Sequence, residues 1–184
     1  EGAFSPEGKR ITEEQKKLRS QFITITIPDG VKELGSSIFK DCKSLATIRI
    51  PESVTEIGWR AFSGCTSLSS VIIPDGVTEI GSEAFSGCAS LSSVIIPESV
   101  TGIGWRAFSG CTSLSSVIIP ESVTEIGNSA FTCCKKLASV IISDSVKGIG
   151  WWAFDGCANL TIHAPAGSYA EQYAKENNIP FVAE

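Results

Sequence analysis

The sequence of 184 residues has no methionine, a single histidine, and no apolar run that approaches the roughly 18 residues needed to cross a bilayer. We therefore expect no insertion into a membrane. With His163 as the one histidine, the sequence offers no nucleophile–base arrangement and no convergent set of metal ligands, so we expect no enzymatic activity, no metal and no cofactor. The chain begins at Glu1 without a signal peptide, and we expect any export signal to lie upstream of it.

Clusters of lysine and arginine are also lacking. The formal net charge is −5, and a surface that binds nucleic acid needs clustered positive charge, so we expect no nucleic-acid partner. Hydrophobic residues make up 42% of the chain, which is enough for a substantial core. They recur in columns, and this recurrence predicts a core shaped as a long strip.

The most informative feature is an internal repeat. The phrase IPESVTEIGWRAFSGCTSLSSVI, residues 50–72, recurs at 96–118 with one change, and looser copies with a 23-residue period fill most of the chain. Such a period indicates that each unit is one supersecondary element that buries its apolar face only against its neighbours, as in a solenoid. The near-identity of the units fits a natural or a designed repeat protein. Six successive units begin at Ile27, Ile50, Ile73, Ile96, Ile119 and Ile142.

Each unit has a predictable inner face. The period-2 rule for strands directs Val71 and Ile73 inward, and Pro74 ends the strand because it has no N–H to donate. We expect Gly81 to adopt a positive φ that a Cβ would penalise. Phe85 supplies the largest buried group. Stacking of the units then predicts an aromatic column, here called the phenylalanine spine, that consists of Phe39, Phe62, Phe85, Phe108, Phe131 and Phe154.

The combined pattern I-P-x-x-V-x-x-I-G-x-x-A-F-x-G-C-x-x-L-x-x-V resembles the BspA-like leucine-rich repeats of bacterial surface proteins, and the resemblance covers residues 22–161. It implies an α/β repeat solenoid of the leucine-rich repeat class, with six 23-residue repeats and a parallel β-sheet on one face. It also implies a secreted or cell-surface protein that binds a host or matrix macromolecule, and it implies no catalytic residues.

Two further segments flank the repeats. Residues 1–21 are expected to form a cap or a divergent repeat, with a helix from Thr12 to Ser20 that shields the first strand. Residues 162–184 resemble the C-terminal cap of such proteins. Here we expect the last repeat strand to end at Pro165, followed by a helix at 168–178 and a short final strand at 179–182.

Two columns of polar atoms could carry chemistry. In a stack, neighbouring cysteine Cβ atoms stay about 4.8 Å apart, beyond the ~3.8 Å that a disulfide prefers, so we expect buried thiols without disulfides. Cys133 lies off the period, in a turn where most repeats have glycine, which predicts an exposed and reactive thiol. An acidic column is expected to be a solvated rim rather than a calcium site. The cysteine column is Cys42, Cys65, Cys88, Cys111, Cys134 and Cys157, and the acidic column is Asp29, Glu52, Asp75, Glu98, Glu121 and Asp144.

Two more columns are expected to point outward from the sheet. Contiguous exposed apolar side chains mark interaction sites, which favours a partner surface with Arg49 as its polar anchor. Because β-branched neighbours also stabilise a sheet by themselves, a purely structural interpretation stays open. The hydroxyl column is Thr24, Thr47, Ser70, Ser93, Ser116 and Ser139. The other column begins with Thr26 and Arg49 and continues as the isoleucine stripe, which consists of Ile72, Ile95, Ile118 and Ile141.

Tryptophans recur at every second repeat. Trp59, Trp105 and Trp151 alternate with smaller residues, and Trp152 follows directly; these four are here called the tryptophan track. The alternation favours packing of each indole over its smaller neighbour. The alternative is an outer aromatic surface for carbohydrate or protein, with Arg60 and Arg106 beside it, because tryptophan and arginine are enriched at binding hot spots.

Taken together, these patterns favour a non-catalytic, adhesion-type binding module of a bacterial surface or secreted protein. Its sheet face is expected to bind a protein or glycan, such as a component of the extracellular matrix. The alternative is a structural spacer or scaffold with no ligand of its own.

Overall fold

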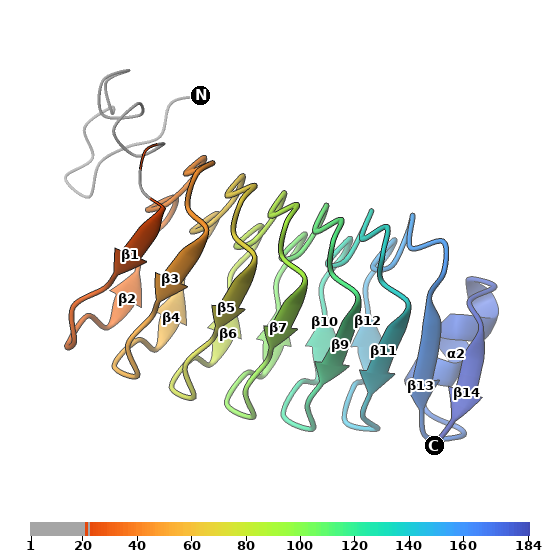
Figure 1. Ribbon diagram of the computed structural model, residues 1–184. Coiled ribbons are helices and arrows are strands. Elements are labelled where there is room, and N and C mark those ends of the chain that lie inside the picture. The colour runs from red at the N-terminus through yellow and green to blue at the C-terminus, as the bar shows by residue number, and fades with distance from the viewer. Residues whose placement is uncertain (1–20, 22) are drawn as a thin grey trace.

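The structure, a computed structural model, describes Gln21 and residues 23–184. The helix expected at Thr12–Ser20, and with it the proposed N-terminal cap, lies outside the described residues. Within them the chain winds through seven turns of a solenoid, and each turn places its strands beside those of the next turn (Figure 1). The stacking confirms the architecture that the repeat period predicts.

The front sheet is parallel throughout. Its strands pair with an offset of one repeat, so that Thr24 lies opposite Thr47 and Ser70 lies opposite Ser93. This regular offset ends at the last turn, where Ser139 pairs with Thr161 rather than with Ile162. The strands are β1 (Thr24–Thr26), β3 (Thr47–Arg49), β5 (Ser70–Ile72), β7 (Ser93–Ile95), β9 (Ser116–Ile119), β11 (Ser139–Ile142), β13 (Thr161–Ala164) and β14 (Phe181–Ala183). Their pairing divides this front sheet into three hydrogen-bonded groups, β1–β3, β5–β7 and β9–β11–β13–β14.

A second parallel sheet, which the sequence patterns do not predict, runs behind the first (Figure 1). Each of its strands has two residues, the second of which is buried, as in Glu79–Ile80. A two-residue strand is too short to show a period-2 pattern, so periodicity cannot reveal it. The strands are β2 (Glu33–Leu34), β4 (Glu56–Ile57), β6 (Glu79–Ile80), β8 (Gly102–Ile103), β10 (Glu125–Ile126) and β12 (Gly148–Ile149).

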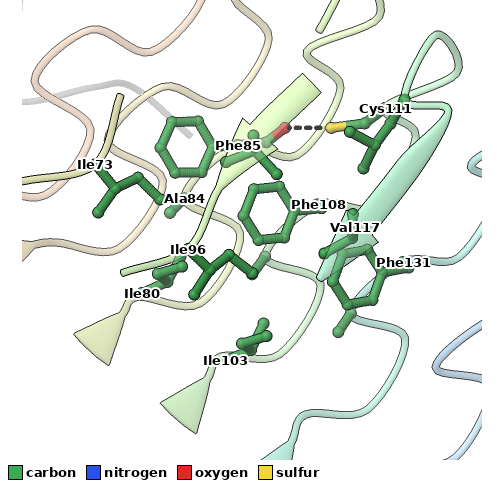
Figure 2. Packing of buried hydrophobic residues seen from close by; sticks show 14 of the residues in the cluster. Ile73, Ile80, Ala84, Phe85, Ile96, Ile103, Phe108, Cys111, Val117 and Phe131 are labelled. Carbon is green, nitrogen blue, oxygen red and sulfur yellow. Dashed lines mark hydrogen bonds between the residues drawn. The ribbon is translucent and has the colours of Figure 1, made fainter. Parts of the chain in front are cut away.

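The core between the sheets is the predicted strip. Rings of the phenylalanine spine stack nearly parallel along the whole array, with neighbouring centroids 5.1–5.3 Å apart (Figure 2). The four central rings are fully buried. Because a buried phenylalanine contributes about 2–3 kcal/mol, the spine is a major part of the stabilising energy.

The repeated glycine has a different role from the one expected. Gly81 does not adopt a positive φ; instead, a Cβ at this position would lie 2.6 Å from the carbonyl oxygen of Ile57 in the preceding turn. The positive φ occurs two residues later, at Glu83, and again at Gly87. Glycine is therefore required at position 81 because two backbones approach each other closely there. The left-handed conformation belongs instead to position 83, which is occupied by a glutamate.

The expectation of an α/β repeat is wrong for the described residues. Turns, rather than helices, close the repeats opposite the front sheet, and successive turns are bonded through their backbones, as where Phe85 N donates to Ala107 O at 2.8 Å. The one helix among them is α2 (Tyr169–Glu176) in the C-terminal cap. Two strands and a tight turn already occupy most of each short repeat, which leaves no length for a helix.

The C-terminal cap agrees with the expectation in its main features. Ser168 caps α2 by accepting a hydrogen bond from Glu171 N at 3.3 Å. Tyr173 on α2 meets Phe154 edge-to-face at 6.1 Å and so covers the end of the phenylalanine spine. The final strand β14 pairs with β13 and continues the front sheet, rather than forming a separate unit.

Candidate binding surface

The isoleucine stripe lies on the exposed face of the front sheet, as predicted. Ile72 is 71% exposed, Ile95 69% and Ile118 63%, whereas Ile141 is 36% exposed. The pairings align the side chains across strands, with Ile72 opposite Ile95 and Ile118 opposite Ile141. Paired parallel strands are about 4.8 Å apart, so each pair of isoleucines lies at that spacing, and the two pairs follow one another along the front of the solenoid.

Local sequence explains why the stripe faces solvent. In the strand Ser70–Ile72 the central Val71 is buried, so its two neighbours point to the opposite face. The hydroxyl column therefore lies beside the isoleucine stripe, and Thr24 and Thr47 hydrogen-bond to each other across strands at 3.1 Å. The surface thus presents an apolar row beside a row of hydroxyl donors and acceptors.

Charged groups lie at both ends of the stripe. Arg49 forms an ion pair with Asp29 at 3.6 Å, and both side chains are well exposed. At the other end His163 continues the row, since it pairs with Ile141, and its Nδ1 lies 3.2 Å from Glu184. Val182 follows His163 in the next strand. The 23-residue period does not predict His163 and Val182 in this row, because the last strands are shifted from the register of the repeats.

The tryptophan track is also exposed. Trp59 and Trp105 are 45% and 42% exposed, and an arginine guanidinium covers each ring, at 4.3 Å from Arg60 and 4.7 Å from Arg106. Each arginine is the residue that follows its tryptophan, so these contacts are local. Trp151 and Trp152 are more exposed and meet edge-to-face at 6.3 Å. The outer aromatic surface therefore stays a prediction, and since Trp59 and Trp105 are each more than half buried, their positions also fit packing against neighbouring residues.

One ion pair sits in this outer region. Arg60 donates two hydrogen bonds, from Nε and Nη2, to the Glu83 carboxylate at 2.9 Å each. Glu83 is almost fully buried, so the bidentate geometry satisfies a carboxylate that would be costly to leave unpaired. The position equivalent to Glu83 after Arg106 is Ser129. Arg106 has no equivalent carboxylate partner among the described residues.

Five of the six cysteines in the column are buried, as expected, whereas Cys157 is only partly buried. All seven cysteines lie in the described part of the chain, and none forms a disulfide. Thiols of the column donate to phenylalanine carbonyl oxygens, as from Cys111 Sγ to Phe85 O at 3.3 Å (Figure 2). Burial raises the pKa of the Cys88 thiol to about 12, and burial also raises the pKa of Cys111 well above its ordinary value. Cys133 is exposed, as predicted; its reactivity remains a prediction.

The acidic column is exposed at the edge where the front strands end. In the described part of the chain, no group of three or more His, Cys, Asp or Glu side chains is close enough together to hold a metal ion. Likewise, none of the helices in that part is both long enough and apolar enough to cross a membrane.

The stacked repeat turns, with their inward-facing strand residues and their column of stacked phenylalanines, define a leucine-rich repeat solenoid. Residues 16–106 and 78–172 match the family described as the BspA type leucine rich repeat region, which is present in six copies. The chain belongs to this family, and the resemblance seen in the sequence is confirmed.

Two solved structures show how closely the fold is shared. The crystal structure of the T. pallidum leucine rich repeat protein (TpLRR) is 30% identical in sequence and superposes with a TM-score of 0.76, over 100% of this chain and 96% of that chain. The pneumococcal vaccine antigen PcpA is 20% identical, with a TM-score of 0.70 over 89% of this chain and 42% of its own, and shares the fold alone. A comparison with curated protein sequences gives no significant match.

Proposed function

We propose that this chain is a non-catalytic, adhesion-type module that binds a protein partner through the isoleucine stripe. The observation that supports the proposal is the row of exposed isoleucines on a rigid sheet. Monomeric proteins rarely expose contiguous apolar patches larger than a few hundred Å², and patches of that kind mark interaction sites. A surface or secreted location, and a host or matrix partner, belong to the same proposal and derive from the family to which the chain belongs.

The geometry suits a macromolecule. The stripe is long and straight, whereas a small molecule is expected to need a concave pocket of several hundred Å³. Strand pairing holds Ile72 beside Ile95 and Ile118 beside Ile141 before a partner arrives, so docking costs little conformational entropy. The hydroxyl column beside the stripe offers hydrogen bonds, as does the His163 imidazole at one end, and Arg49 at the other end offers charge for orienting the partner.

The loss of binding free energy on replacing isoleucines of the stripe can be worked out from the exposed fractions of their side chains. Full burial of an isoleucine side chain is worth about 1.5–3 kcal/mol, and Ile95 and Ile118 are each about two-thirds exposed. Replacing both by threonine keeps β-branching but removes most of the apolar contact. We expect this double change to cost about 2–3 kcal/mol of binding free energy, or roughly 30- to 150-fold in Kd.

The experiment is a surface plasmon resonance screen of the whole chain against purified extracellular-matrix proteins. The hits are then repeated with the double variant Ile95→Thr and Ile118→Thr. Threonine already occupies this column at Thr26, so the variant is expected to melt close to the parent. The matched control is Trp105→Ser with Trp151→Ser, since serine occupies the same column at Ser36 and Ser82.

Loss of binding in the isoleucine variant but not in the tryptophan variant supports the proposal. The reverse result would show that the tryptophan track is the binding surface. If the screen gives no binding at all, the chain is better described as a spacer or scaffold, which the near-identity of the repeats also fits.

A further inference from the structure

A shallow pocket lies at the C-terminal end of the solenoid, between the last outer turn and the segment that follows α2. Its volume is about 290 Å³, close to the lower limit for small-molecule sites. No residue of the isoleucine stripe lines it, so it is a separate feature of the molecule. The lining residues used below are Trp152, Asp155, Tyr173, Asn177 and Asn178.

Trp152 forms one wall of this pocket and is the least expected residue in its column. It has a φ of 58°, a left-handed conformation that a bulky side chain rarely adopts. The same column holds Ser37 and Ser129 with the same backbone conformation, so the repeat itself does not require an aromatic ring here. The Trp152 side chain is 66% exposed, and the neighbouring Trp151 is 75% exposed. Packing therefore does not explain the indole.

Polar groups with unused hydrogen-bonding capacity surround the same pocket. The side chains of Asp155 and Asn178 make no hydrogen bond or ion pair with any described residue, and both are exposed. Asn177 donates from Nδ2 to Tyr173 O at 2.9 Å, which leaves its side-chain carbonyl oxygen as an acceptor. The pocket therefore combines an aromatic plane with carboxylate and amide oxygens and an amide N–H donor.

This combination specifies the chemistry of a ligand. The C–H face of a pyranose ring packs on an aromatic ring, and its hydroxyl groups both donate to carboxylate or amide oxygens and accept from amide N–H groups. Among the lining residues Asp155 carries the one charge, and no lysine, arginine or histidine is present to pair with an anion. Sialic acids, uronic acids and phosphates would therefore meet an unopposed carboxylate.

We propose that this pocket is a binding site for one or two units of a neutral carbohydrate, with the sugar ring stacked on Trp152 and its hydroxyls bonded to Asp155 and Asn178. The site is independent of the protein-binding surface proposed above. It gives the chain a second recognition element at one end of the solenoid.

The test uses isothermal titration calorimetry of the whole chain with chitotriose, cellotriose, mannotriose and lactose as neutral probes, and with N-acetylneuraminic acid as the anionic probe. We expect saturable binding of at least one neutral probe in the millimolar range. Trp152→Ser is expected to weaken it at least about tenfold, and Asp155→Ser about three- to tenfold, because each removes a direct contact. Serine occupies both columns elsewhere, at Ser129 and Ser109, so both variants are expected to fold.

Two control variants test whether carbohydrate binding depends on the pocket and not on other exposed apolar side chains. Trp105→Ser removes an exposed tryptophan outside it, and the double variant Ile95→Thr and Ile118→Thr alters the front sheet; both are expected to bind the neutral probe like the parent. The proposal is overturned if no neutral probe binds at millimolar concentration, if Trp152→Ser binds like the parent, or if Trp105→Ser loses binding equally. Tighter binding of N-acetylneuraminic acid than of any neutral probe would also overturn it.

Discussion

Replacing Phe108 by alanine tests whether the phenylalanine spine holds the solenoid together as one unit. The Phe108 ring is fully buried and stacks on both faces, against Phe85 and Phe131, with centroids 5.3 Å away on each side. A buried Phe→Ala change costs about 3–5 kcal/mol, and each aromatic pair is worth about 0.5–1.5 kcal/mol beyond area burial. Because two such pairs are lost, we expect a cost in the upper part of the range, about 4–5 kcal/mol.

Position along the spine provides the matched controls. Phe39 is partly buried and has one stacking partner, Phe62, so Phe39→Ala is expected to cost about 2–3 kcal/mol. Phe181 packs at the edge of the core outside the spine, and its replacement is expected to cost about 1–2 kcal/mol. The expected order of destabilisation is therefore Phe108, then Phe39, then Phe181.

The assay is urea denaturation followed by far-UV circular dichroism, with linear extrapolation to the free energy of unfolding. An unchanged m-value would show that the variant still unfolds as one unit, whereas a reduced m-value would show that the two halves have become uncoupled. Equal losses for Phe108, Phe39 and Phe181 would refute the reasoning, because they would mean that the number of stacked neighbours has no energetic consequence.

The cysteines give two further predictions. In native protein a thiol reagent is expected to modify exposed Cys133 first and half-buried Cys157 more slowly. The buried thiols of the column are expected to react only after unfolding. Three disulfides found by mass spectrometry would contradict this prediction. The second prediction concerns pH: burial raises the pKa of Cys88 from 9.0 to about 12, so below pH 9 the thiol is neutral in both states and stability is unaffected. Above pH 9 the unfolded chain releases this proton and the folded chain keeps it, so the Cys88 thiol lowers the free energy of unfolding by up to about 1.4 kcal/mol per pH unit until the folded pKa is reached. Cys88→Ser is expected to show a shallower fall than the parent between pH 9 and 11, and identical slopes would show that the Cys88 thiol does not cause it.

Much of the candidate surface could be predicted from the sequence. Strand side chains alternate between the two faces, so the burial of Val71 determines that Ile72 points outward, and the repeat period determines that Ile72 and Ile95 align. The continuation of the row to His163 could not be predicted in this way, because β13 is shifted by one residue from the repeat register.

Glycine 81 illustrates a limit of local reasoning. A glycine that avoids a neighbouring backbone and a glycine that adopts a positive φ leave the same letter in the sequence. Only the distance between successive turns, with Ile57 O 2.6 Å from the place a Cβ would occupy, distinguishes the two causes.

The sequence by itself determined the solenoid, its buried columns and its outward isoleucines, because each depends on a short period repeated without interruption. The tertiary structure alone decided the features that depend on contacts between segments far apart in the chain. The pocket joins Trp152 and Asp155 in the last turn to Asn178 beyond α2, and no periodic pattern links these residues. Their proximity results from the way Tyr173 packs against the end of the phenylalanine spine and so sets the position of the segment that follows α2.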